Sequence, residues 1–213
     1  MDEIFIREIQ KIRESLEKKL STERYEHTLG VSYTAAALAM RWSGDIRKAE
    51  LAGLLHDCGK YGTEEELLLR CKRHEVKLSE DDLGSPAVIH GKYGCYLART
   101  KYGITDPEVL NAIAFHTTGR TGMSLLEKVV FTADYIEPLR DRAENLKRIR
   151  KLAFTDLDLC MHEMLSATIC WLKKRELPIH KDTIQAEADF SALLSARGEG
   201  PEAERKKHIR SGE

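Results

Sequence analysis

The sequence has almost no net charge and no long apolar run. Its 34 lysines and arginines nearly balance 35 aspartates and glutamates, so the formal net charge is only -1. That balance offers no global electrostatic reason to bind nucleic acid or a membrane surface. No stretch approaches the roughly 18 consecutive apolar residues of a spanning helix, and the charged, amphipathic N-terminus does not resemble a secretory signal. We therefore expect a cytoplasmic protein without a nucleic-acid or membrane partner.

Cysteine pairs are also missing. The five cysteines are odd in number and none has CxxC spacing, which favours free thiols in a reducing compartment over a disulfide framework. One of them, Cys58, lies between Asp57 and Gly59, where a thiolate is a conceivable metal ligand. A small buried thiol is the simpler interpretation.

Proline is rare, and strand-like alternation of apolar and polar residues is nearly absent. Apolar residues instead recur at helical spacing between turn signals. The pattern predicts one all-α domain over residues 1–195, with its core at about 20–175, and a charged, disordered tail over 196–213. The predicted helices cover residues 2–20 and 22–40, a stretch after Asp45 that ends at 56–59, a short helix from 63, one after Ser85, one from 105–108 to near His116, one from Ser124 to Pro138, and a long one from Leu146 or Ala153 to Lys174, with a short element after Pro178.

Several predicted helix ends carry specific signals. Thr63 and Ser124 each precede a glutamate by three residues, which is the pattern of a capping box. Ser85 before Pro86 predicts an N-cap followed by proline at the first helical position. Gly59 is well placed to end the third helix.

Six residues of types that bind metals lie on the apolar faces of these helices or at their ends: His27, His56, Asp57, His90, His116 and Asp134. A buried histidine or aspartate is costly unless it is paired or ligates a metal. Their distribution over separate helices suggests one polar centre inside a helical bundle. Neutral imidazole and carboxylate are common ligands of iron, manganese, nickel and zinc, so the sequence predicts a metal centre.

Each of these residues also has a simpler interpretation. A lone histidine on an apolar face is usually a hydrogen-bonded core residue, and Asp134 could cap a helix or pair with Arg142. The ordered set of six makes the metal interpretation the better one. The remaining histidines lack such a context, and we expect them at the surface: His74, His162, His180 and His208.

The order of these residues, together with four short stretches, resembles the HD-domain metal-dependent phosphohydrolases, and in detail their YqeK-type bacterial branch. The stretches are YEHTLGV (25–31), AGLLHDCGK (52–60), AFHTTG (114–119) and ADYIEP (133–138). A bare HD dipeptide is a weak signal, but the ordered set with the last two stretches is specific. The similarity covers roughly residues 20–175.

The resemblance implies a single HD-domain helical bundle with a metal centre between its helices. It further implies an iron-containing enzyme, with one or two ions, that cleaves diadenosine tetraphosphate symmetrically into two ADP by attack of metal-activated water on phosphorus. By carry-over, His27, His56, Asp57 and Asp134 form one ion site. His90 and His116 hold a second ion, and Asp57 bridges the two. Manganese, nickel and zinc suit the same ligands.

Residues near the ligands in sequence are the candidates for substrate binding. Lys60 follows the metal pair and could bind a phosphate as a point charge, beside Asp57 as the second catalytic candidate. The other candidates for substrate contact are Thr117, Thr118, Gly119, Arg140, Arg24 and Tyr135. Leu139 precedes Arg140 where the family usually has a polar residue, so the loop over 139–145 departs from the family pattern.

Two rival functions fit the same residues. One is an HD-type phosphohydrolase that acts on another nucleotide, and the other is a metal-containing, nucleotide-binding regulatory module without turnover. A complete ligand set with Lys60 favours an enzyme. The exposed faces of the first and last helices could build a homodimer.

Overall fold

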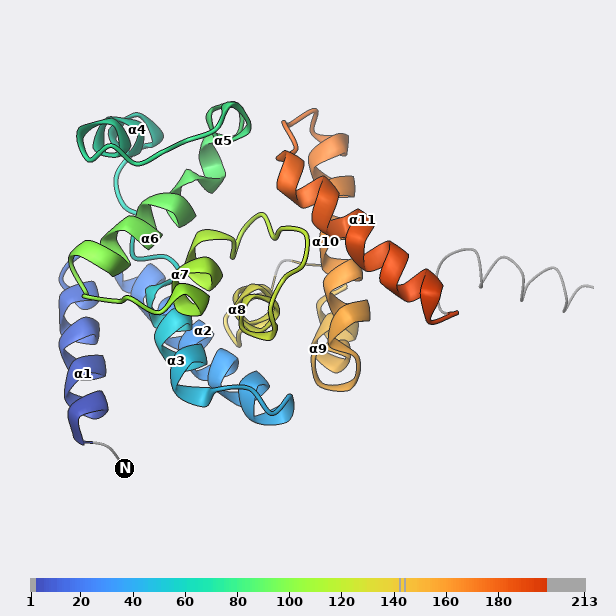
Figure 1. Cartoon of the computed structure of the whole chain (residues 1–213), viewed down its shortest axis with the longest axis horizontal. Coiled ribbons are helices and arrows are strands. Elements are labelled where there is room, and N and C mark those ends of the chain that lie inside the picture. Colours follow the sequence, from blue (N-terminus) through green and yellow to red (C-terminus); the bar gives the residue numbers. More distant parts are fainter. Residues whose placement is uncertain (1–2, 142, 144, 199–213) are drawn as a thin grey trace, which may run out of the picture.

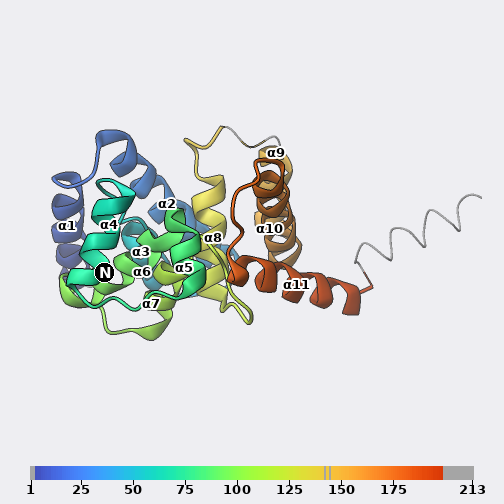
Figure 2. The same cartoon turned by 90° about the horizontal axis from the view of Figure 1, so that it is seen from above.

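The computed structural model describes residues 3–141, 143 and 145–198. Within these residues every regular element is a helix and no strand is present, which confirms the all-α prediction. Figures 1 and 2 show a larger group of helices, α1 to α7, and a smaller group, α9 to α11, with α8 between them. No described helix combines the length and apolar character needed to cross a membrane.

The larger group contains seven α-helices and one 3-10 helix. They are α1 (Glu3–Glu17), α2 (Thr22–Arg41), α3 (Ile46–Leu55), α4 (Glu64–Arg73), α5 (Glu80–Gly84), η1 (Pro86–Val88), α6 (Ile89–Thr100) and α7 (Pro107–Ala114). A first apolar core lies between α1, α3, α4, α6 and α7, where Leu16, Leu54, Leu55, Ile89 and Ile113 are fully buried. Each such side chain stabilises the fold by about 1.5–3 kcal/mol.

The remaining helices enclose a second core together with α2. They are α8 (Leu125–Ile136), α9 (Leu146–Thr155), α10 (Leu157–Lys174) and α11 (Lys181–Ala196). Leu38, Ile149 and Met164 are fully buried there. Helix α8 contributes Val130 to the first core and Val129 to the second. It therefore stands between the two cores, and Asp134 lies near its C-terminal end.

The helix starts follow the predicted caps. Thr63 and Ser124 both form the predicted capping boxes. Each hydroxyl accepts from the backbone N–H of the glutamate three residues later, and the side chain of that glutamate accepts from the backbone N–H of the capping residue. Asp45 caps α3 and Asp106 caps α7, with proline in the first turn of α7. These signals are local in sequence, which is why they were legible before the fold was known.

Three expectations about the second half were wrong. The long helix predicted up to Lys174 is two helices, because Asp156 adopts an extended backbone and its side chain caps α10 by accepting from the N–H of Leu159. The short element after Pro178 is the 16-residue helix α11. His180 is buried rather than exposed, since its Nδ1 caps α11 and its Nε2 lies 3.3 Å from Oδ1 of Asp82.

One predicted helix end was wrong and one helix start was right only in part. Helix α3 ends at Leu55, and Gly59 has no positive φ, so it is not a helix stop. A Cβ at Gly59 would lie 2.7 Å from the backbone of His90 and of Gly94, so this glycine allows α6 to approach closely. Ser85 is the N-cap residue of η1 and Pro86 its first residue, as predicted, but the serine side chain makes no capping hydrogen bond, and α6 begins only at Ile89. Helix α5 was not anticipated.

The other predictions have mixed outcomes. All five cysteines are free, as predicted. His74 is exposed as predicted, whereas His162 is partly buried. Four predictions fall outside the described residues: the start of the first helix at residue 2, the position of Arg142, that of His208, and the disordered tail from 199 onward.

Candidate metal centre

The six predicted metal-binding residues come together although they span more than a hundred positions. They are His27 on α2, His56 and Asp57 just after α3, His90 on α6, His116 just after α7 and Asp134 on α8. Five are buried, and the side chain of Asp134 is 21% exposed. The helices therefore converge on one polar centre that opens to solvent beside Asp134.

Asp57 lies at the middle of this centre. Its Oδ1 is 3.2 Å from Nε2 of His90 and 3.5 Å from Nε2 of His116. Its Oδ2 is 3.4 Å from Nε2 of His56 and 3.9 Å from Nε2 of His27. Each oxygen of one carboxylate thus faces a different pair of histidines, which is the geometry of a bridging ligand.

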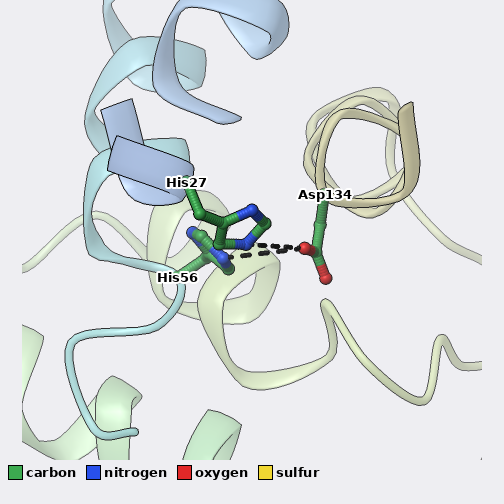
Figure 3. Close-up of side chains that lie close together, drawn as sticks. All are labelled: His27, His56 and Asp134. Carbon is green, nitrogen blue, oxygen red and sulfur yellow. Dashed lines mark ion pairs between the residues drawn. The ribbon is translucent and has the colours of Figure 1, made fainter. Parts of the chain in front are cut away.

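His27, His56 and Asp134 form a compact group on the Oδ2 side (Figure 3). Oδ1 of Asp134 is 3.1 Å from Nε2 of His27 and 3.9 Å from Nε2 of His56. The ligand atoms of this group all lie within 4.8 Å of one another, and so do those of His56, Asp57 and His116. Each group could hold an ion. Both groups include His56, whose Nε2 faces Oδ2 of Asp57, the same oxygen that faces His27.

Hydrogen bonds at Nδ1 orient three of the imidazoles. Nδ1 of His56, His90 and His116 lies 2.7 to 2.8 Å from the backbone carbonyl three residues earlier. Those carbonyls belong to Gly53, Ala87 and Ile113. Because a carbonyl only accepts, Nδ1 carries the proton and each Nε2 presents its lone pair to the centre.

His27 is oriented by a carboxylate instead. Its Nδ1 lies 3.0 Å from Oε1 of Glu137, which is buried at the end of α8. The other oxygen of Glu137 accepts from the N–H of Leu139 at 2.7 Å, and Gly30 leaves room for it. Sequence analysis did not single out Glu137 or Gly30, although both lie in stretches that carried the family resemblance.

The environment keeps the ligands in the protonation states that bind cations. Burial by itself raises the pKa of Asp57, but the imidazoles of His56, His116 and His90 outweigh it and hold that pKa well below its usual range. Burial lowers the pKa of His90 to about 4, against the opposing pull of Asp57. At neutral pH the carboxylate is charged and the His90 imidazole is neutral, as metal ligands must be.

The centre also leaves buried polar atoms without a hydrogen-bond partner among the described residues. They are Nε2 of His27, Nε2 of His56 and Oδ1 of Asp57. An unsatisfied buried polar atom costs about 1–3 kcal/mol, and three of them converge here. Imidazole nitrogen and carboxylate oxygen suit divalent metals of the first transition row, so the residues present fit a metal ion.

Cys58 is not part of this ligand set. Its Sγ donates to the carbonyl of Gly94 at 3.4 Å, and burial raises the pKa of the thiol to about 12. A neutral thiol that points at a carbonyl is a packed core group. The simpler interpretation of Cys58 is therefore the one that the structure supports.

Three of the predicted substrate residues are cations at the open side of the centre. Nη1 of Arg24 lies 2.8 Å from Oδ2 of Asp57, and Nζ of Lys60 lies 3.7 Å from its Oδ1. Nη2 of Arg140 lies 2.6 Å from Oδ1 of Asp134, whose predicted alternative partner Arg142 is not described. The three side chains are 31%, 41% and 42% exposed, so they reach both the carboxylates and solvent.

The other predicted substrate residues differ in position. Oγ1 of Thr117 is 3.3 Å from Nε2 of His90, beside the centre. Thr118 is buried and donates to the carbonyl of Gly119, which has a φ of 66° and so shapes the turn. The hydroxyl of Tyr135 donates to Asn145 at 3.1 Å. Thr117 is thus the one of these four with a contact to a candidate ligand.

Comparisons with known proteins identify the family of this chain. The HD domain family model matches residues 24–139, a range that contains all six candidate ligands. A solved structure from Clostridium acetobutylicum, described as a predicted HD superfamily hydrolase involved in NAD metabolism, superimposes with a TM-score of 0.83. It is 38% identical and covers 87% of this chain and 97% of its own.

Two curated relatives are similar over most of their length. A protein of Halalkalibacterium halodurans is 41% identical over 82% of this chain and 91% of its own length. A protein of Bacillus subtilis is 39% identical over 79% of this chain and 89% of its own length. Both carry the name bis(5'-nucleosyl)-tetraphosphatase, symmetrical. The chain therefore belongs to the HD domain family of hydrolases, as its sequence motifs predicted.

Proposed function

We propose that this protein is a metal-dependent hydrolase that cleaves diadenosine tetraphosphate symmetrically into two molecules of ADP. The observation that carries the proposal is the convergence of four imidazoles on the two oxygens of Asp57, with three cations beside them. The two curated relatives are named for this reaction. A divalent ion bound at such a centre polarises a phosphoryl oxygen and makes its bound water acidic enough to react near neutral pH.

The ligands divide into two ion positions in this proposal. His27, His56 and Asp134 would hold one ion, His90 and His116 would hold the other, and Asp57 would be a ligand shared by both. The hydrogen bonds at Nδ1 keep every Nε2 pointed at the centre before a substrate arrives. Preorganised ligands of this kind do not have to be rearranged during the reaction.

The three cations bind the polyphosphate. A tetraphosphate bridge carries several negative charges, and Arg24, Lys60 and Arg140 present positive charge on the exposed side of the same centre. Arg24 and Arg140 can hold phosphate oxygens in a bidentate manner, and Lys60 acts as a point charge. A cut that leaves two ADP requires attack at an inner phosphate, so both nucleoside ends must lie outside the metal centre. Thr117 adds a hydroxyl at the same edge.

Several finer assignments belong to the same proposal. Iron is the metal that the family resemblance favours, and four imidazoles with two carboxylates suit it. Free cysteines fit a reducing cytoplasm. Residues 1–195 act as one HD domain in this proposal. A homodimer would use the exposed faces of the first and last helices, where Ile4 and Ile6 of α1 are 69% and 44% exposed and Ile184 and Leu193 of α11 are 50% and 42% exposed.

The direct test is turnover of diadenosine tetraphosphate by metal-analysed protein, with the products separated by chromatography. We expect ADP as the sole nucleotide product. AMP together with ATP would show an asymmetric cut and contradict the proposal. No turnover by protein that contains metal would favour another nucleotide as the substrate, and protein that binds no metal would favour the binding-module alternative.

A further inference from the structure

His27 differs from the other three histidines in what holds its Nδ1. His56, His90 and His116 donate to neutral backbone carbonyls of their own helical turns, whereas His27 contacts the side chain of Glu137, 110 positions away. The imidazole of His27 is thereby held between two acidic residues, Asp134 of α8 and Glu137 directly after this helix. Asp134 lies 3.1 Å from its Nε2, and Glu137 lies 3.0 Å from its Nδ1.

Both oxygens of Glu137 have a nitrogen partner. Oε1 lies 3.0 Å from Nδ1 of His27, and Oε2 accepts from the backbone N–H of Leu139 at 2.7 Å. When Nε2 of His27 serves as a metal ligand, its proton lies on Nδ1, which then donates to Oε1. A carboxylate behind a ligand fixes the tautomer and the ring orientation, and it makes the ligating nitrogen a better electron donor. Backbone carbonyls orient their rings without adding a negative charge.

The chain leaves space for this carboxylate at Gly30, one helical turn after His27. A Cβ at Gly30 would lie 2.6 Å from Oε2 of Glu137 and 3.4 Å from its carboxyl carbon. Glycine inside a helix is less favourable than alanine, and φ here is not in the left-handed region. The reason for glycine is therefore the space that Glu137 occupies.

We propose that Glu137 is a positioning residue that, with the space left by Gly30, fixes His27 and makes the ion position of His27, His56 and Asp134 the tighter of the two. The proposal rests on the metal centre of the proposed function. It adds that the anionic partner of His27 strengthens this position beyond what its second carboxylate, Asp134, already contributes, since the other three histidines have neutral partners.

The test is titration of the metal-free protein with Co²⁺, with the number of ions, their dissociation constants and the visible absorption bands recorded for each variant. The wild type should bind two ions with different affinities. Glu137→Gln should weaken the tighter one by about 10–100-fold and leave the other unchanged. The amide removes the charge, and it cannot accept from both N–H donors at once.

Two further variants sharpen the test. Gly30→Ala should weaken binding of the same ion, because the new methyl group displaces the carboxylate. The double variant Gly30→Ala/Glu137→Gln should bind this ion no more weakly than Glu137→Gln alone. Glu127→Gln is the matched control: Glu127 is as buried as Glu137 but pairs with Arg120 and caps α8. It should bind Co²⁺ like the wild type.

The possible failures can be told apart. Wild-type affinities in Glu137→Gln, or an equal loss for both ions, would overturn the inference while leaving the metal centre in place. An equal loss in Glu127→Gln would do the same, since it would reduce the effect to general stability. A wild type that binds no Co²⁺ would overturn the proposed function together with the inference. If Glu137→Gln does not fold by circular dichroism, Gly30→Ala decides.

Discussion

The two oxygens of the Asp57 carboxylate have different surroundings. The Oδ2 side, with His27, His56 and Asp134, is surrounded by charge, because Arg24, Arg140 and Glu137 all contact its members. On the Oδ1 side, His90 and His116 are held by backbone carbonyls. Glycines there bring the backbones together, and a Cβ at Gly59 or at Gly91 would lie 2.7 Å from backbone atoms of a neighbouring segment.

This difference indicates that the two sides contribute in different ways to metal and phosphate binding. Backbone carbonyls and close-packed helices hold ligands rigidly but contribute no net charge. Carboxylates and guanidinium groups set the local charge and can also meet an anionic substrate. The Oδ2 side therefore has more of the charged groups that set ion affinity and meet phosphate, whereas the Oδ1 side relies on backbone geometry and has Lys60 as its cation.

The largest effect should come from breaking both sides at once with Asp57→Ala. Both ion positions lose their shared ligand, so turnover should fall by far more than the roughly 100-fold that loss of an outer partner costs. Bound metal should fall with it. Asp82→Ala is the control, because Asp82 is an equally buried aspartate that contacts His180 and Lys92 instead. Wild-type turnover in a folded Asp57→Ala variant would disprove the site assignment.

The pH dependence of the metal-free protein should sharpen the description of the Oδ1 side. The pKa of His90 in the folded protein is about 4, below the ordinary 6.5. Between these values the unfolded chain binds more protons than the folded protein, so a falling pH favours the unfolded state. Stability should fall by up to about 3 kcal/mol as pH drops from about 6.5 to 4. Asp57, whose pKa is also depressed, should add a further loss only as pH falls below about 4.

Urea unfolding of chelated protein across this pH range measures the effect. His90→Gln should remove most of the slope between pH 6.5 and 4. The same change at His74, which is exposed, should leave it intact. An unchanged slope in His90→Gln would mean that His90 is not the group responsible.

Gly59→Ala should damage the Oδ1 side through packing alone. The new methyl group meets the carbonyl of His90 and the N–H of Gly94, which are backbone atoms that cannot rotate away. We expect a loss of about 1–3 kcal/mol of stability and weaker binding of the ion on this side only. Gly84→Ala is the control, since a Cβ there meets nothing within 4 Å. Equal effects of the two substitutions would contradict the packing argument.

Lys60→Ala should have the smallest effect. Lys60 is 41% exposed and lies 3.7 Å from Asp57, so its removal should cost one charged contact with phosphate, or about tenfold in KM, with a smaller change in kcat. Steady-state kinetics compared with the exposed Lys77→Ala variant would measure this. An unchanged KM would exclude Lys60 from phosphate binding.

The convergence of the candidate ligands and the helix caps were predictable because their signals are local or additive. A capping box such as that of Thr63 needs only four residues, and a histidine or aspartate on an apolar face is conspicuous in any helix. The break at Asp156 had a local signal as well, an aspartate before an apolar run, but continuous helical periodicity outweighed it.

The remaining features depend on contacts between distant segments. Nothing near Glu137 indicates that it meets His27, and nothing near Gly59 indicates the approach of α6. His180 looked like a surface residue until α11 placed it beside Asp82. Such roles follow from the tertiary arrangement, which one sequence without the fold does not contain.

The most direct test of this account is the ion content per chain of wild type, His27→Ala and His116→Ala at saturating metal. The account predicts two ions in the wild type and one in each variant, because each histidine belongs to one side of Asp57 only. Two ions in either folded variant, or none in both, would contradict a centre made of two positions that share one carboxylate.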